Sequence, residues 1–158
     1  TCLIHEKDLL EKRRQAGRSL QPAALVVSGS GEIPSHLPFF EQPLERWLFS
    51  EPGLNSSNAN AIGLGFQQYR SLAPWPELLA DVAAEGLERL LVLGGAQLAG
   101  CLLAEQLIDE LQLTLCPQLL GGPHTWVPWQ QAQVGSSWQL QEQRPLEGDE
   151  LLLRYRRV

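Results

Sequence analysis

Short apolar runs recur along the chain and predict the strands of a sheet. The run Ala23–Val27 is apolar at every position, which is typical of a strand buried on both faces. Leu90–Leu93 is equally apolar, and we expect it to be the most buried strand of the sheet. Further strands are predicted at Arg46–Ser50, Ala61–Phe66, Asp109–Cys116, Ser137–Arg144 and Glu150–Val158.

Three longer segments have the composition and end signals of helices. The segment His5–Ala16 is rich in charged helix formers and stops before Gly17, a residue that commonly ends helices. Pro74–Ala84 carries prolines in its first turn and Gly86 beyond its end, the usual asymmetry of a helix. Gln97–Leu107 alternates apolar and polar faces at helical spacing.

The order of these segments predicts the fold class. Strands and helices alternate along most of the chain, and only strands follow the last helix. This order predicts a three-layer α/β/α fold with a mostly parallel sheet and antiparallel strands at the C-terminus. The linkers are short, so we expect one domain spanning residues 1–158.

Composition narrows the class of protein. Of 158 residues, 44% are hydrophobic, which is enough to build a core without a metal or disulfide. Twelve basic against 18 acidic residues give a net charge of −6, which argues against a general nucleic-acid binder. No apolar run approaches the roughly 20 residues that cross a bilayer, so no membrane association is expected. Three scattered cysteines (Cys2, Cys101 and Cys116), without metal spacing, predict reduced thiols in a cytoplasmic protein and no metal site.

The junction Leu93–Leu98 joins a predicted strand to a predicted helix through two glycines. The first turn of a helix offers unpaired backbone N–H groups and the positive end of the helix dipole, and both favour an anion such as a pyrophosphate. In open α/β sheets, ligands bind beyond the carboxyl ends of the strands, where this turn lies. The alternative interpretation is a tight turn that simply needs small residues.

Other motifs of catalysis and phosphate binding are absent. Ala96 stands where the second glycine of a GxGxxG motif belongs, and no P-loop, GxSxG or HExxH motif occurs. We expect His124 to be a surface histidine rather than a base. The adjacent Asp109 and Glu110 would point to opposite faces of a strand and are not expected to act as a pair. The sequence therefore identifies no catalytic residue or proton donor.

Two tryptophans in an irregular loop, Trp126 and Trp129, flank Pro128. Large aromatic side chains in a loop are suited to the wall of a ligand pocket or to a subunit contact. Both interpretations stay open from the sequence.

The segment Leu90–Gly122 (LLVLGGAQLAGCLLAEQLIDELQLTLCPQLLGG) resembles the C-terminal reductase domain of RibD-type riboflavin-biosynthesis proteins, which have a dihydrofolate reductase-like fold. The matching motifs are Gly94-Gly95 after an apolar strand, Leu107–Leu111 (LIDEL) and Pro117–Gly122 (PQLLGG). Their combination is more specific than any one of them.

This resemblance implies an NADPH-dependent oxidoreductase, cytoplasmic and homodimeric. It implies hydride transfer to the ribose-derived carbon of a phosphorylated ribosylaminopyrimidine, which gives the ribityl chain. It also implies that the peptide bond Gly94–Gly95 is cis, and that Ser28 and Ser50 lie near the adenosine and its 2′-phosphate. The pyrophosphate would be held by backbone groups of Gly94, Gly95, Ala96, Gln97 and Leu98.

The sequence departs from the family pattern in two places. Leu93 stands on the substrate side, where the family usually has an acidic residue, and a leucine cannot hydrogen-bond a sugar or an amine. The family's first strand and helix have no counterpart, and the chain contains no Met, so we expect the domain to be N-terminally incomplete. Two alternatives therefore stay open: a non-catalytic nucleotide-binding or dimerisation domain, and a reductase of another pterin- or pyrimidine-like substrate.

Overall fold

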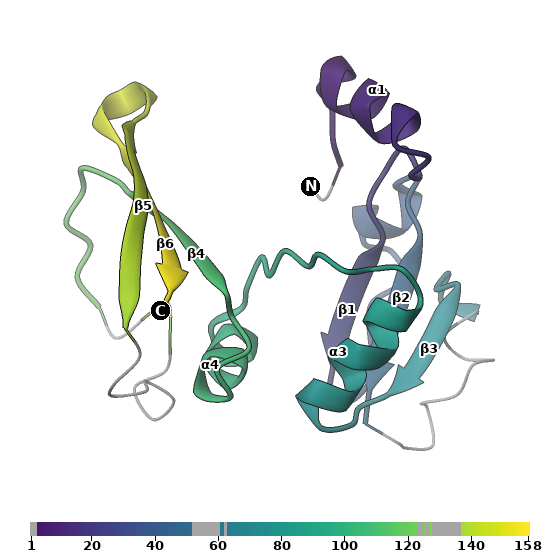
Figure 1. Ribbon diagram of the computed structural model, residues 1–158. Coiled ribbons are helices and arrows are strands. Elements are labelled where there is room, and N and C mark those ends of the chain that lie inside the picture. The colour runs from purple at the N-terminus through teal and green to yellow at the C-terminus, as the bar shows by residue number, and fades with distance from the viewer. Residues whose placement is uncertain (1–2, 52–60, 62, 123–124, 126, 128–136) are drawn as a thin grey trace. The chain divides into compact units, whose positions relative to one another are not determined.

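The computed structural model describes residues 3–51, 61, 63–122, 125, 127 and 137–158. It has the mixed α/β fold that the order of elements predicts, with one parallel and one antiparallel sheet (Figure 1). The chain divides into two compact units, Thr1–Pro74 and Trp75–Val158.

The first unit is built around a parallel sheet. Its elements are the helix α1 (Lys7–Gln15), the strand β1 (Ala24–Ser28), the 3₁₀ helix η1 (Pro38–Glu41), and the strands β2 (Arg46–Ser50) and β3 (Gln68–Ser71). The strand order is β1-β2-β3, and both pairs are parallel (Figure 1). Every residue of the central strand β2 is buried, as a strand covered on both faces requires.

The third strand lies later in the chain than the sequence pattern indicates. We predicted it at Ala61–Phe66, but Ala61 is helical and the backbone N–H of Phe66 donates to the carbonyl of Ala61 (2.9 Å), which closes a turn. Gly65 has a φ of +90°, a conformation that glycine adopts readily and a strand does not contain. The apolar side chains of this segment therefore cover the sheet rather than form part of it.

The core of the first unit lies on one face of this sheet. Leu48, Ala61 and Phe66 are each 2% exposed and form its centre. The rings of Phe40 and Phe66 meet edge to face at 5.4 Å, which joins the loop before β2 to the turn before β3. Partly buried side chains complete the cluster: Val26, Ile33, Phe39, Phe40, Leu64 and Tyr69.

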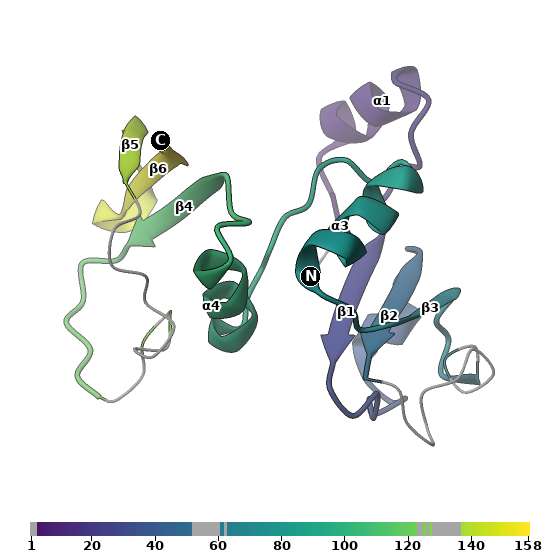
Figure 2. The same ribbon diagram turned by 60° about the horizontal axis from the view of Figure 1, so that its bottom comes forward.

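The described part of the second unit contains helices and an antiparallel sheet. Its elements are α3 (Trp75–Ala84), α4 (Ala96–Ala104), β4 (Glu110–Leu115), β5 (Trp138–Pro145), the 3₁₀ helix η3 (Glu147–Asp149) and β6 (Leu151–Arg157). The strand order is β4-β6-β5, with β6 between the other two (Figure 2). The predicted antiparallel C-terminal strands are therefore confirmed.

The segment Leu90–Leu93 is not the buried strand that its composition indicates. It contains no strand, and its side chains are 45%, 81%, 36% and 70% exposed in chain order. A strand exists only through hydrogen bonds to a neighbouring strand, and nothing in an isolated apolar run specifies that neighbour. Composition thus identified a segment suited to burial, but not the pairing that would bury it.

Candidate functional site

The segment that leads into α4 turns sharply at two glycines. The peptide bond between Gly94 and Gly95 is cis, as predicted. Gly94 has a φ of +115°, which is accessible to glycine and strained for other residues. Gly95 is the N-cap of α4, and its carbonyl accepts the backbone N–H of Ala99 (3.0 Å), the first bond of the helix.

The N-terminus of α4 is suited to an anion. Gly95 has no side chain to cap the helix, so the backbone N–H groups of Ala96, Gln97 and Leu98 have no acceptor within the helix or from a cap. A methyl group added at Gly94 or Gly95 would meet no other atom within 4 Å, so this corner is open to a ligand. The first turn contains no acidic residue, whereas α1 has Asp8 and α3 has Glu77 in theirs.

Leu93, the residue before this turn, offers only hydrocarbon. Its side chain is 70% exposed. It can neither donate nor accept a hydrogen bond, so it cannot perform the polar contact that the family usually makes here.

Three serines align at the carboxyl ends of the parallel strands. Ser28 on β1 is in register with Ser50 on β2, and Ser50 is in register with Ser71 on β3. Ser50 is fully buried, and the hydroxyl of Ser28 accepts the backbone N–H of Gly31 (3.2 Å). The family resemblance implies a site role for Ser28 and Ser50, and Ser71 takes the matching register position on β3, where no strand was predicted because the third strand was placed too early in the chain.

The structure therefore brings the predicted site residues together in two groups. Ser28 and Ser50 are neighbours on the sheet of the first unit. Gly94–Leu98 is a continuous stretch of the second unit. The first group lies at the carboxyl ends of strands and the second at the start of a helix, the two places where ligands of α/β proteins bind.

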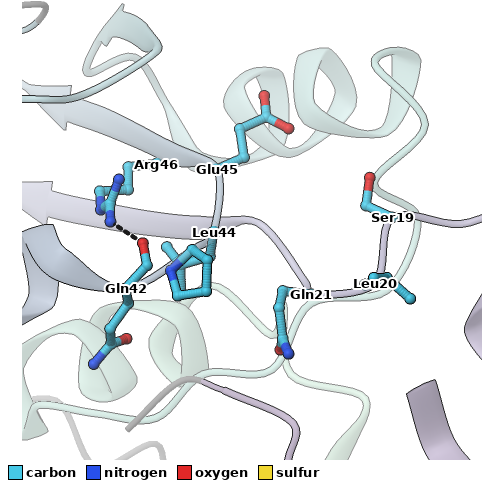
Figure 3. A pocket seen from close by; sticks show the side chains of 8 residues that line it. Ser19, Leu20, Gln21, Gln42, Leu44, Glu45 and Arg46 are labelled. Atoms are coloured by element: carbon cyan, nitrogen blue, oxygen red, sulfur yellow. Dashed lines mark hydrogen bonds between the residues drawn. The ribbon is translucent and has the colours of Figure 1, made fainter.

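A pocket of about 450 Å³ lies elsewhere, beside the amino ends of β1 and β2 (Figure 3). Arg46, which lines this pocket, is buried. Its guanidinium donates to the backbone carbonyls of Phe39 (3.1 Å), Phe40 (3.0 Å) and Gln42. These bonds connect Arg46 to η1 and to the loop that follows it. The charge of Arg46 therefore stabilises the fold and is not available to a ligand. Ligands of parallel sheets bind at the carboxyl ends of strands, and we assign no binding role to this pocket.

The thiols do not form a reactive centre. The described residues contain two cysteines, Cys101, which is partly buried, and Cys116, which is exposed. The Sγ of Cys116 donates to the Oε1 of Glu150 (3.3 Å), and this bond raises the pKa of the thiol. Because the thiolate is the nucleophile, a raised pKa keeps Cys116 unreactive.

Other candidate chemistry is limited within the described part of the chain. Asp109 pairs with Arg157 (3.3 Å) and Glu110 pairs with Arg156 (2.8 Å), so each carboxylate has its own partner. No group of three or more potential metal ligands occurs among the residues that the structure describes. In that same part, no helix is long and apolar enough to cross a membrane. His124, Trp126 and Trp129 lie outside it.

Comparison with known families identifies the family of the chain. The profile of the RibD C-terminal domain family matches residues 3–151, so the chain belongs to this family. No curated protein sequence gives a significant match.

Solved structures share the fold. A pyrimidine reductase-like protein from Corynebacterium diphtheriae superposes with a TM-score of 0.82 at 16% identity, over 99% of this chain and 69% of that one. Acinetobacter baumannii RibD gives a TM-score of 0.69 at 22% identity, over 87% of this chain and 38% of that one. A diaminohydroxyphosphoribosylaminopyrimidine deaminase/5-amino-6-(5-phosphoribosylamino)uracil reductase from Thermotoga maritima gives 0.63 at 14% identity, over 87% and 38% respectively.

Proposed function

We propose that the chain is a reductase domain that reduces the ribose-derived carbon of a phosphorylated ribosylaminopyrimidine with a reduced nicotinamide dinucleotide. Family membership supports the class of reaction. The observation that carries the proposal is the start of α4, where uncapped backbone N–H groups face an open corner without an acidic side chain.

The residues of this corner fit the coenzyme's charge. The backbone N–H groups of Ala96, Gln97 and Leu98 would donate to the pyrophosphate, and the two glycines would let it approach the backbone closely. Ser28 and Ser50 would lie near the adenosine end, where Ser28 is partly exposed and would offer its hydroxyl. The bound coenzyme supplies the hydride, so the chain's own residues have to bind, orient and exclude water.

The family resemblance makes NADPH the first coenzyme to test. NADH shares its nicotinamide and pyrophosphate and would use the same helix end. The chemistry proposed here is therefore the same for both coenzymes, and the charges near the adenosine ribose decide between them.

The exposed leucine before the Gly-Gly turn favours two alternatives. A substrate pocket with Leu93 in place of an acid would lose discrimination for a hydroxylated substrate. The domain would then bind a nucleotide or dimerise without catalysis, or reduce another pterin- or pyrimidine-like compound.

The proposal also includes the setting of the protein. We propose that residues 1–158 form one domain and that it acts as a cytoplasmic homodimer on a small molecule, without nucleic-acid or membrane partners. The net charge of −6 is in keeping with the absence of a nucleic-acid partner.

The variant Ala96→Asp tests the helix end directly. A carboxylate there would repel a pyrophosphate and weaken coenzyme binding by about five- to thirty-fold. The same carboxylate suits the positive end of the helix dipole, so thermal stability should not fall. Gln112→Glu adds the same charge on β4 and should bind normally.

Intrinsic tryptophan fluorescence, titrated with NADPH and NADH, measures these affinities. Absence of saturable binding by both coenzymes would overturn the reductase proposal. Binding without coenzyme oxidation by the ribosylaminopyrimidine phosphate would instead favour the alternatives. Unchanged affinity in Ala96→Asp would show that the pyrophosphate binds elsewhere.

A further inference from the structure

The C-terminal end of α4 closes with a defined backbone motif, at the opposite end of the helix from the proposed pyrophosphate contacts. The backbone N–H of Leu107 donates to the carbonyl of Leu102 (2.9 Å). The backbone N–H of Gln106 donates to the carbonyl of Leu103 (3.0 Å). Together these bonds form a Schellman motif, which places a left-handed residue just beyond the helix. Gln106 takes that position with a φ of +58°, where glycine is the usual residue.

The side chain of Arg157, the last residue of β6, reaches this helix end. Its guanidinium donates from Nη1 to the backbone carbonyl of Gln106 and from Nη2 to the carboxylate of Asp109 (3.3 Å). The backbone N–H of Arg157 also donates to the carbonyl of Asp109 (2.9 Å). Asp109 lies in the short connection between α4 and β4, so Arg157 joins the helix end, this connection and the sheet.

The backbone of Arg157 belongs to the central strand of its sheet. β6 pairs with β4 on one side and with β5 on the other (Figure 2). Arg157 itself is in register with Trp138 of β5. Its side chain is 29% exposed, whereas that of Asp109 is 88% exposed. The guanidinium therefore extends to the helix end from a well-held position.

The helix itself has little buried surface. α4 has nine residues, and Gly100 and Leu102 are the two that are buried. Isolated helices of this length are marginal in water, so their order depends on contacts with the rest of the protein. A cation at the C-terminal end also interacts favourably with the helix dipole. Arg157 thus supplies both a hydrogen bond and a charge where α4 needs support.

The direction of α4 determines where its first N–H groups point. A helix of this length is about 13 Å long, so a tilt of about 10° at its C-terminal end moves the N-terminal end by about 2 Å. Hydrogen bonds to an anion need donor–acceptor distances of about 3 Å. A tilt of that size would therefore remove the donors of Ala96, Gln97 and Leu98 from a bound pyrophosphate.

We propose that Arg157 is a positioning residue for coenzyme binding, which holds the C-terminal end of α4 and so directs the first N–H groups of the helix at the pyrophosphate. This inference rests on the proposed function and adds to it a residue at the far end of the helix. It uses contacts within the second unit alone. Arg157 also lies beyond residues 3–151, the part that matches the family.

Amide hydrogen exchange and coenzyme titration of the full chain test the inference. Arg157→Met keeps an unbranched apolar stem but removes every donor, so it should accelerate exchange in α4 and leave exchange in the first unit unchanged. It should also weaken the binding of NADPH and NADH, measured by tryptophan fluorescence, by about threefold to tenfold, because a smaller fraction of the protein has the helix in the binding orientation. Arg157→Lys keeps a donor and the charge, so both coenzymes should bind within about twofold of the wild type.

Arg156→Met is the matched control. It removes the same charge from the neighbouring residue of β6, whose guanidinium pairs with Glu110 of β4 (2.8 Å) and not with the helix end. It should change neither the exchange of α4 nor the affinity for either coenzyme. Thermal melts followed by circular dichroism establish that each variant is folded at the temperature of the titrations.

The outcomes separate this inference from the proposed function. An arginine with a merely structural role would lower the melting temperature of Arg157→Met without changing the affinity of the folded protein, and that result would overturn the inference alone. Equal weakening by Arg157→Met and Arg156→Met would assign the effect to net charge and would also overturn it. Absence of coenzyme binding by the wild-type protein would overturn the proposed function and this inference together.

Discussion

Arg46 carries a charge that is almost fully buried at the start of β2, with 6% of the residue exposed. Its guanidinium satisfies carbonyls of the loop before β2 and lies 5.3 Å from the ring centre of Phe39. Replacing it by methionine would leave the carbonyl of Phe40 without this donor and would remove one of two donors from the carbonyls of Phe39 and Gln42. We expect Arg46→Met to lower the free energy of unfolding by about 2–4 kcal/mol, measured by urea denaturation.

The lysine variant separates charge from geometry at this position. Arg46→Lys keeps the charge but has a single ammonium in place of the planar fork, so it cannot reach all the carbonyls at once. Its stability should fall between those of the wild type and Arg46→Met. Equal stability of all three proteins would contradict the role assigned to the guanidinium.

The carboxyl group of Glu110 makes the stability of the folded protein depend on pH. Its hydrogen bond from Arg156 holds the pKa of the carboxyl below its ordinary value. A lowered pKa in the folded state stabilises the protein at neutral pH, and this contribution disappears as pH falls through the carboxyl range. We expect Glu110→Gln to lower the melting temperature slightly at pH 7 and not at pH 3.

A salt titration provides the control for this exposed pair. At high ionic strength, screening should narrow the difference between the wild type and Glu110→Gln at pH 7. A difference that persists unchanged at low pH would show that the glutamine perturbs β4 in some other way.

At the scale of elements, local signals were sufficient where an element is defined by its own residues. The helix α1 ends as predicted because Gly17, with a φ of +67°, supplies the left-handed residue beyond it. β2 has the predicted bounds because its apolar residues are contiguous and all of them are buried. The strand β3, with the sequence QYRS, has no such pattern, because its place depends on pairing with β2.

Gly17 provides a test of how that helix end is specified. A methyl group there would meet no atom within 4 Å, so only the backbone conformation opposes a side chain. Gly17→Ala should lower the free energy of unfolding by about 1 kcal/mol, and Gly17→Asn by less, because asparagine tolerates this conformation better. The measurement is urea denaturation followed by far-ultraviolet circular dichroism.

Gly29 is the matched control for this variant. A methyl group added at Gly29 would also meet no atom within 4 Å, but the φ of this residue is not in the left-handed region. Gly29→Ala should therefore be neutral or slightly stabilising, because it restricts the unfolded chain. If both alanine variants cost the same, the backbone conformation of Gly17 is not what determines its cost.

At the scale of the whole molecule, the candidate site was predictable only where it is continuous in sequence. Gly94–Leu98 is one continuous stretch, so its helix start follows from glycines placed directly before a helical pattern. Ser71 joins Ser28 and Ser50 only through the register of three strands, which no local pattern encodes.

The surface of the second unit bears on whether the protein associates with a second copy of itself. Leu119 is fully exposed and Leu120 is 87% exposed, so two adjacent leucines present hydrocarbon to water. Exposed apolar groups of this kind favour association, and the proposed homodimer would bury them. We expect sedimentation equilibrium to give the mass of a dimer. Leu119→Glu should shift the equilibrium towards monomer, because the dimer interface would then bury an unpaired charge.

Val158→Glu is the control, because it adds the same charge at another exposed apolar residue, 80% accessible, and should remain dimeric. A monomeric wild type would contradict the homodimer, whereas equal dimerisation of both variants would place its interface away from Leu119.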